Sequence, residues 1–399
     1  MSPLFPLPPM RWTATLSAML VLLASGPAPA QVYLRGQGEP VAGEIARVGP
    51  EGIGVSIGAG VKTIGWDRVR EVRGENGAAA AREMLAVTDL WRARTRLERA
   101  DFGAAEPILD ALVAGQRGVV GPTAAVVFEG LVRCRLRRGA QAGAVWAWLE
   151  WVRVRGGAPG TVPDASSLWI GGRIDAAPIF DVQTGLITSL PPVFLRDAAL
   201  DASGASDEWN RFPGVEPATT ELAMLYRAAV RFEAGLDPEV GSIASSSESV
   251  RLVADVVLAR VGDDGQRKAA RANLQGRIDQ RDVEPWVECW CRVGLGRSLV
   301  RESEPELSRA GVVQLLHVPS RFARFSTSAA SIALAESAVA LHDLGDELGA
   351  IALKSELMER FARSNATGWA RLREIKPPAE KSRAAPAKDV PSTPEGEGG

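Results

Sequence analysis

Histidine, the side chain that most often carries acid–base or metal chemistry, is scarce in this sequence. The 399 residues contain only His317 and His342, which are too far apart for the H-x-x-x-H spacing of a helical metal pair. Both histidines lie in segments with a helical pattern of apolar residues. We therefore interpret them as ordinary helix residues and predict no metal site from them.

The three cysteines also give little reason to expect chemistry. Cys289 and Cys291 flank Trp290 inside a helical pattern, and residues two apart on a helix point about 200° away from each other. A disulfide or a metal site between these two thiols is therefore not expected, and small buried side chains are the better interpretation. Whether Cys134 pairs with Cys289 or Cys291 stays open, and an odd number of cysteines leaves at least one thiol unpaired.

Two further clusters have the right residue types but the wrong spacing. Val300 stands where a G-x-S-x-G nucleophile turn would need its last glycine, after Gly294-Leu295-Gly296-Arg297-Ser298. An acidic, glycine-containing stretch is similar to a calcium loop, but Ala199 and Asn210 occupy positions that need carboxylates. The acidic stretch comprises Asp197, Asp201, Ser203, Asp207 and Glu208. We predict no catalytic, cofactor-binding or metal-binding residue, no cofactor and no enzymatic activity.

The first thirty residues have the pattern of an export signal. Arg11 precedes an apolar run from Leu16 to Ala24, and Ala28-Pro29-Ala30 forms an A-x-A cleavage site. The apolar run is shorter than the ~20 residues that a bilayer span needs. We predict that 1–30 is a signal peptide cleaved after Ala30, and that the mature chain is periplasmic or secreted, without a stable membrane span.

Residues 31–74 predict a small β domain. Short β-branched runs alternate with glycine and proline turns, which gives four or five strands in about 42 residues. The runs are Val32–Arg35, Pro40–Val48, Gly52–Ile57, Val61–Trp66 and Val69–Val72. In strand number and turn spacing the segment resembles an SH3-like or Sm-like barrel, which implies a docking module.

The apolar period becomes helical over 78–154 and again over 219–375. In the first of these ranges Trp148 and Trp151 share a helix face while Trp146 points elsewhere, which is typical of packing between helices. Between them, 155–218 is an irregular insertion rich in Gly, Pro, Ser and Asp, which includes a short helix near Val193–Ala202. Residues 376–399 lack periodicity and are predicted to be a disordered tail.

The clearest helical hairpin is Ser331 to Ser364, which consists of two short helices joined by Leu344-Gly345-Asp346. Small residues stand where the helices of a hairpin would cross, and weaker copies of the pattern occur upstream. The residues of the pattern, both the small ones and the large apolar ones such as Leu341 and Leu357, are Ala338, Leu341, Gly345, Ala350 and Leu357, then Ala93, Phe102, Ala105, Leu109 and Leu112, then Gly139 and Ala144.

These hairpins resemble tetratricopeptide repeats, whose unit is a 34-residue helix pair. Ala105 and Ala144 are instead 39 residues apart, and Leu334 and Asp89 stand where the family has a tryptophan in its first helix. The resemblance implies a mainly α fold, in which an α-α hairpin superhelix follows a small all-β barrel domain. It also implies scaffolding through a concave, peptide-binding groove.

Composition agrees with a globular partner-binding protein. The chain has 46% hydrophobic and 24% charged residues and a formal net charge of −2, so no basic excess suggests nucleic-acid binding. We expect an exported helical scaffold or adaptor whose partner is a protein or peptide of the cell envelope. The alternative is a hydrolase of envelope polymers with its site in 155–218. A nucleic-acid or polysaccharide binder would be favoured by a contiguous basic or aromatic patch on 31–74.

Overall fold

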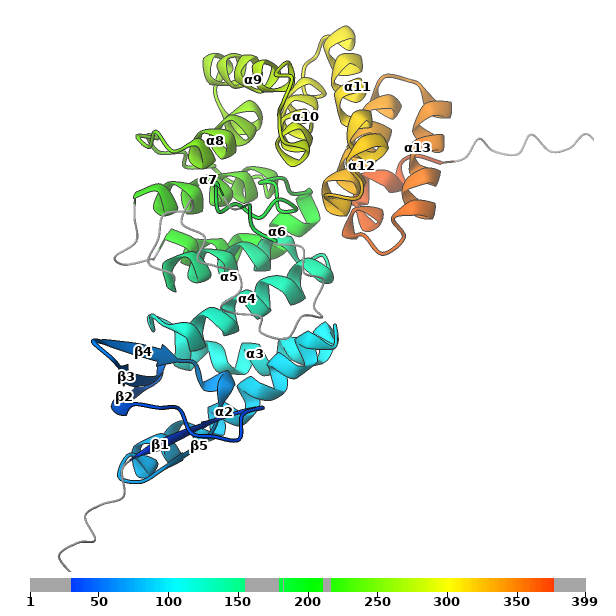
Figure 1. Cartoon of the computed structure of the whole chain (residues 1–399). Helices are drawn as coiled ribbons and strands as arrows, with labels where there is room; N and C mark the ends of the chain where they lie inside the picture. Colours follow the sequence, from blue (N-terminus) through cyan, green and yellow to red (C-terminus); the bar gives the residue numbers. More distant parts are fainter. Residues whose placement is uncertain (1–29, 155–178, 182, 211–216, 377–399) are drawn as a thin grey trace, which may run out of the picture. The chain divides into compact units, whose positions relative to one another are not determined.

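The computed structural model describes residues 30–154, 179–181, 183–210 and 217–376, and these are mainly helical with a small β part at the start (Figure 1). The predicted signal peptide and tail, together with much of the predicted insertion, lie outside this range. The described residues form two compact units. Unit 1 contains the strands and the helices up to residue 154, and unit 2 contains the chain from 179 onward except for the first residues of helix α7.

The strands form where they are predicted. They are β1 (Gln31–Leu34), β2 (Glu44–Gly49), β3 (Gly52–Ile57), β4 (Gly60–Ile64) and β5 (Val69–Arg73). The closed barrel, however, is wrong: in the described part, β2-β3-β4 form one antiparallel sheet and β1 pairs with β5 in another. Between β1 and β2 only an isolated bridge joins Tyr33 to Pro40. Proline has no N–H, so it cannot extend a ladder at this point.

Unit 1 joins the β part to four helices. The helices are α2 (Gly77–Glu98), α3 (Phe102–Gln116), α4 (Pro122–Arg137) and α5 (Gln141–Val154), and each packs on the next. The turn η1 (Trp66–Arg68) anchors the strands, because the Trp66 N–H donates to Thr123 Oγ1 at 3.1 Å and Asp67 forms a buried ion pair with Arg94. Trp66 is fully buried. The β part therefore shares its core with the helices of unit 1.

The predicted roles of the tryptophans on α5 are confirmed. Trp148 and Trp151 are buried in unit 1, whereas Trp146 is only half-buried. Trp146 contacts the Phe128 ring edge-on at 5.7 Å, and the Arg135 guanidinium lies 5.7 Å from its centroid. These aromatic side chains hold helices together, as their spacing predicts.

Unit 2 is a series of helices. They are α6 (Arg196–Ser206), α7 (Pro217–Glu233), α8 (Glu248–Val261), α9 (Asp264–Ile278), α10 (Pro285–Leu299), α11 (Pro305–Arg321), α12 (Thr327–Asp343) and α13 (Glu347–Arg360). Each helix from α8 to α13 packs against the next one along the chain, so the helical character predicted for this part of the sequence is confirmed. Short 3-10 turns follow α6 (η3, Asp207–Asn210) and α13 (η4, Asn365–Gly368; η5, Ala370–Arg373).

The hairpin predicted at 331–364 is present as α12 and α13. Gly345 has φ of 81° in the connecting turn, a conformation that glycine adopts without strain, and the Gly349 N–H donates to the Asp346 side chain at 2.9 Å to cap α13. Ala338 and Ala350 are fully buried where the two helices meet. Small residues at this crossing let the helix backbones approach closely.

The acidic stretch does not form a calcium loop, as its spacing indicated, and the short helix predicted near Val193–Ala202 is present as α6. Asp197, Asp201 and Ser203 lie on helix α6, and Asp207 begins the 3-10 turn after it, so these side chains do not converge as the ligands of a loop would. Within the residues that can be described, no group of three or more His, Cys, Asp or Glu could hold a metal ion. In the same ranges no helix has both the length and the apolar character needed to cross a bilayer.

Candidate functional site: the two faces of helix α7

Helix α7 presents polar side chains on two opposite faces, and each face holds a non-helical segment of the chain. Glu221, Met224, Arg227 and Arg231 are spaced three, three and four residues apart, so they form one stripe. Tyr226 and Glu233 lie on the other side of the helix. We call residues 237–245 the outer strap and residues 186–195 the inner segment.

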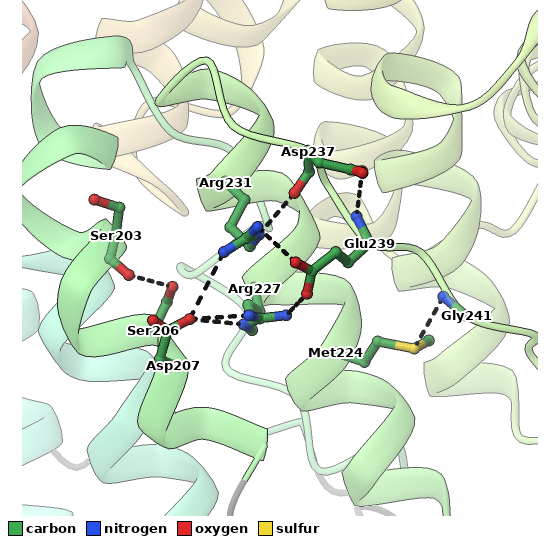
Figure 2. A network of polar contacts seen from close by, with 9 residues as sticks. All are labelled: Ser203, Ser206, Asp207, Met224, Arg227, Arg231, Asp237, Glu239 and Gly241. Carbon is green, nitrogen blue, oxygen red and sulfur yellow. Dashed lines mark hydrogen bonds and ion pairs between the residues drawn. The ribbon is translucent and has the colours of Figure 1, made fainter.

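The outer strap returns along the stripe after α7 ends. The carboxylate of Glu239 accepts from Arg227 at 2.6 Å and from Arg231 at 2.7 Å, and Arg231 also donates to the backbone carbonyl of Asp237 at 2.7 Å (Figure 2). Asp207, at the end of α6, accepts from Arg227 at 2.9 Å. The two arginines thus share carboxylates from the elements before and after α7.

The other end of the outer strap is held through its backbone. The Gly241 N–H donates to the sulfur of Met224 at 3.3 Å, and the N–H groups of Ala244 and Ser245 donate to the carboxylate of Glu221 at 2.8 and 3.2 Å. Most of these contacts use backbone groups, which every residue type has. The stripe on α7 therefore recognises an extended segment with one well-placed carboxylate rather than one fixed sequence.

In the stripe the two arginines are paired with carboxylates, and those carboxylates remain partly exposed to solvent. Burial alone would lower the pKa of Arg227, but its hydrogen bonds to Glu239 and Asp207 outweigh this effect and raise the pKa above its usual value. Side chains of Asp207 and Glu239 remain 54% and 48% exposed. Ion pairs with one partner this exposed contribute about 0–1 kcal/mol each. These ion pairs therefore contribute little to holding the outer strap in place.

The inner segment is held by donors from three helices. Tyr226 on α7 donates to the carbonyl of Leu190 at 2.6 Å, Trp290 on α10 donates to the carbonyl of Thr188 at 2.9 Å, and Arg297 on α10 donates to the carbonyl of Phe194 at 2.8 Å. Ser326, the N-cap of α12, donates to the carbonyl of Ser189 at 3.3 Å. These four carbonyls lie on a segment that is not helical.

Apolar side chains fix the inner segment far more strongly than the outer strap. Six of them are buried, namely Leu186, Ile187, Leu190, Val193, Phe194 and Leu195. At about 1.5–3 kcal/mol per buried side chain, their removal from water is worth on the order of 10 kcal/mol. The inner segment is therefore part of the core, and a partner peptide cannot use this face of α7.

A buried charge cluster closes the inner face. Arg297 is 3% exposed and contacts Glu336 on α12 at 2.7 Å and Glu233 on α7 at 3.1 Å, while Arg260 on α8 donates to Glu233 at 2.8 Å. Burial alone would raise the pKa of Glu233, but the guanidinium groups of Arg297 and Arg260 outweigh it and hold that pKa below its usual range. The cluster thus joins four helices through two guanidinium groups and two carboxylates.

This cluster does not have the layout of a catalytic centre. The cavity beside Glu233, Arg260 and Arg297 has a volume of about 10 Å³, which is room for about one water molecule. Each guanidinium is matched by a carboxylate, so no charge is left for a substrate. We interpret the cluster as a structural clamp.

The residues considered from sequence stay apart. His317 lies on α11 and His342 on α12, and both are half-buried helix residues as predicted. Cys134, Cys289 and Cys291 are free and buried, and burial raises the pKa of each thiol to about 12. Such thiols are unreactive near neutral pH, which confirms their interpretation as small buried side chains.

The residues that hold the two segments were not singled out by the sequence. Arg227 and Arg231 had a readable signal, since two arginines one turn apart precede the acidic Asp237-Pro238-Glu239 after the helix end. Arg297 had no such sequence signal, because its partners Glu233 and Glu336 are distant in sequence. Comparisons with protein-family models, with curated proteins and with solved structures each found no match.

Proposed function

We propose that this chain is an exported, non-catalytic helical scaffold that binds protein or peptide partners of the cell envelope. The observation that carries the proposal is the outer strap: α7 already holds an extended acidic segment through Glu221, Met224, Arg227 and Arg231. A partner segment with the same chemistry can take its place. The export part of the proposal rests on the sequence pattern of 1–30.

The finer fold belongs to the same proposal. We infer a tetratricopeptide-like superhelix from the consecutive pairing of α8 to α13 and from the small buried residues at the α12–α13 crossing. The inner segment alters what that resemblance implies. The helices already have an occupant where the inner segment packs, so partners are expected on the opposite stripe of α7, in place of the outer strap.

The alternative, an envelope-polymer hydrolase, gains no support from the described residues of 155–218. Asp181 accepts from the Thr184 N–H in a tight turn, Asp197 accepts from the Ala370 N–H, and Asp207 pairs with Arg227. Each of these carboxylates stabilises a turn, a helix end or an ion pair. Paired carboxylates facing an open site, as glycoside hydrolysis requires, are not seen in the part of 155–218 that the structure describes.

The proposal can be tested with a labelled peptide of residues 235–246, which contains the outer strap. Wild-type protein should bind it weakly, because the tethered strap competes at a high effective concentration. Glu239→Gln protein should bind it about tenfold more tightly, since its own strap no longer pairs with both arginines. Arg227→Gln/Arg231→Gln protein should lose binding. Fluorescence anisotropy measures all three.

The control is the same peptide carrying Glu239→Gln, which should bind the Glu239→Gln protein much less well than the native peptide does. A partner captured from an envelope fraction should be released by the native peptide and retained in the presence of the control peptide. Equal binding to wild-type and Glu239→Gln protein would contradict the exchange of the strap. Failure of the native peptide to release any captured protein would contradict the scaffold role of this stripe.

A further inference from the structure

A second polar surface lies in unit 1, on the outward side of the β1–β5 pair. Along β1, Val32 and Leu34 are buried, and Tyr33 alternates with them to the other side. The Arg70 and Arg73 guanidinium groups lie 5.4 and 4.7 Å from the centroid of the Tyr33 ring. We call Tyr33, Arg35, Arg70, Arg73 and Trp91 the arginine–aromatic patch.

Helix α2 completes the patch. The Arg35 guanidinium lies 4.5 Å from the centroid of the Trp91 ring, and Trp91 is 39% exposed, unusual for a tryptophan. This arrangement holds Arg35 in place by a cation–π contact instead of an ion pair. The patch therefore combines strand and helix residues within the single compact unit 1.

The positive charge of the patch is not fully neutralised. Glu71 pairs with Arg73 at 2.7 Å, and the nearby Asp67 is committed to a buried ion pair with Arg94. Within the described part of the chain, no carboxylate lies at ion-pair distance from Arg35 or Arg70. Burial and the charge of Arg70 lower the pKa of Arg35, an effect that Asp67 only partly opposes. Arg35 and Arg70 thus lack a contacting counter-charge, since Asp67 and Glu71 act on them only from beyond ion-pair distance.

An incoming carboxylate would supply that counter-charge. The enclosed Nε of Arg35 has no hydrogen-bond partner among the described residues, so internal bonds do not use up the guanidinium. Arg, Tyr and Trp are the residue types most enriched at the centres of protein–protein interfaces. Hydrogen bonds from guanidinium to carboxylate are stronger than neutral ones and fix orientation.

Most of the patch is a basic and aromatic surface on 31–74, the feature that would favour a nucleic-acid or polysaccharide binder, but nucleic acid fits it less well. Single-stranded nucleic acid is held by bases stacked on open aromatic faces, whereas guanidinium groups already lie over the rings of Tyr33 and Trp91. A phosphate backbone also needs a long track of cations, and the chain carries a formal net charge of −2. The observations favour an acidic segment of a protein.

We propose that Arg35 and Arg70 form a docking site for the carboxylates of an acidic segment in a protein partner, with Trp91 and Tyr33 holding the two guanidinium groups in place. This inference rests on the proposed scaffold function, and it adds a second contact on a different unit from the stripe on α7. A partner that engages both sites gains from their linkage within one chain.

The test uses a fluorescein-labelled hexaglutamate peptide and the full-length mature chain at low ionic strength. Arg35→Gln/Arg70→Gln should weaken binding about tenfold or more, since each charged hydrogen bond is worth about as much as a factor of ten. The matched control is Arg82→Gln/Arg99→Gln, which removes the same charge from exposed positions on and just after α2 and should leave binding unchanged. Circular dichroism verifies that both variants are folded.

Equal losses in the two variants would overturn the proposal, because they would show only a dependence on net charge. Stronger binding of an oligothymidine probe than of hexaglutamate, lost in Arg35→Gln/Arg70→Gln, would also overturn it in favour of nucleic acid. The scaffold function is tested separately. If a captured partner is released by the 235–246 peptide but binds Arg35→Gln/Arg70→Gln normally, the patch proposal fails and the scaffold proposal stands.

The converse result is equally distinct. If hexaglutamate binding depends on Arg35 and Arg70 but no envelope protein is released by the 235–246 peptide, the patch proposal stands and the strap-based scaffold proposal fails. Binding of the 235–246 peptide should itself be unaffected by Arg35→Gln/Arg70→Gln, since its arginines lie on α7.

Discussion

At the scale of single residues, Arg297 determines more of unit 2 than any site that sequence motifs suggested. One guanidinium contacts Glu233, Glu336 and the carbonyl of Phe194, and so connects α7, α10, α12 and the inner segment. Burial alone would lower the pKa of Arg297, but Glu336 and Glu233 overcome that effect and raise it. The arginine is therefore always charged, and its removal leaves two buried carboxylates without their main partner.

We predict that Arg297→Met destabilises unit 2 by about 3–5 kcal/mol, the usual cost of removing one partner from a buried ion pair. Hydrogen exchange of the α10 amides measures the loss as a faster opening. Arg309→Met is the control, because Arg309 and its partner Glu306 are 57% and 83% exposed, and its effect should stay within about 0.5 kcal/mol.

The quadruple variant Arg297→Met/Arg260→Met/Glu233→Leu/Glu336→Leu should recover much of the loss, since apolar side chains then replace the whole cluster. If the α10 amides of Arg297→Met protein exchange as slowly as those of wild-type protein, the interpretation of this cluster as a clamp is wrong.

Acid should weaken the same cluster. The folded-state pKa of Glu233 is held below its unfolded value of about 4.3, so its contribution to stability is complete above that pH and is lost as pH falls through the folded pKa. We predict that Glu233→Gln is less stable than wild-type protein at pH 7 and that the difference shrinks as the pH falls below the unfolded-state pKa of about 4.3. The measurement is the midpoint of urea unfolding at each pH in this range, monitored by hydrogen exchange of the α10 amides.

Asp67 provides the contrast, because burial outweighs Arg94 and raises its pKa. A carboxyl with a raised folded pKa favours the folded state increasingly as pH falls, so Asp67→Asn should not reduce acid sensitivity. If the stability of wild-type protein and of Glu233→Gln protein changes with pH in the same way, the assigned role of Glu233 is wrong.

At the scale of elements, helix α10 shows how one short sequence serves several neighbours. A Cβ on Gly294 would lie 3.3 Å from Val256 on α8, and a Cβ on Gly296 would lie 2.9 Å from the carbonyl of Gly311 on α11. Arg297 turns to the charge cluster, and Ser298 donates to the carbonyl of Ala259. The Gly-Leu-Gly-Arg-Ser stretch, which looked like an incomplete nucleophile turn, is a packing and clamping sequence.

We predict that Gly311→Ala destabilises the α10–α11 pair by about 1–3 kcal/mol. A Cβ there would lie 2.8 Å from the Val300 nitrogen and 2.9 Å from the Gly296 carbonyl, and backbone atoms cannot move aside as a side chain end can. Thermal unfolding and exchange of α11 amides measure the change.

Gly276→Ala on α9 is the matched control. No atom outside the local helix lies within 4 Å of the added Cβ, so the change should stabilise the helix by about 0.5–1 kcal/mol. Similar effects of the two substitutions would show that helix propensity, not the close crossing, governs Gly311.

The sequence predicts elements well where the signal is local. Apolar periodicity located the five strands and the helical hairpins, because each element must bury one face whatever its partners are. The closed barrel failed because the strands divide into two sheets, with η1 between β4 and β5, which strand number alone does not reveal. The short helix predicted near Val193–Ala202 is present as α6, shifted by a few residues to Arg196–Ser206. The inner segment was predicted as irregular, but its burial depends on Trp290 and Ser326, more than 100 residues away.

At the scale of the whole molecule, the two units differ in how they could meet partners. In unit 1 the β part shares its core with α2 and α4 through Trp66, Asp67 and Thr123, so it is better regarded as one face of that unit than as a separate module. In unit 2 the inner segment covers one face of α7, so the stripe on the opposite face is the one left for a partner. The two proposed contacts therefore lie on separately folded units of one chain.

Export is the remaining part of the functional proposal. It predicts a defined first residue for the mature chain, which can be measured. β1 begins at Gln31, directly after the predicted cleavage site, and Gln31 pairs with Arg73 on β5. Cleavage after Ala30 leaves this strand whole, whereas a cut four residues later would remove the buried Val32 and Leu34 from the core of unit 1. Cleavage at the predicted A-x-A site would therefore leave the first strand intact.

We predict that protein recovered from the envelope fraction of its native host has an intact mass that corresponds to a chain beginning at Gln31. Ala30→Leu should block cleavage, since signal peptidases require a small residue at this position, and the precursor should then accumulate at the membrane. Ala24→Leu is the control, because it keeps the apolar run and leaves Ala28-Pro29-Ala30 unchanged. Recovery of unprocessed chain from the cytoplasm for both the wild-type protein and the control would rule out export, and with it an envelope partner for either docking site.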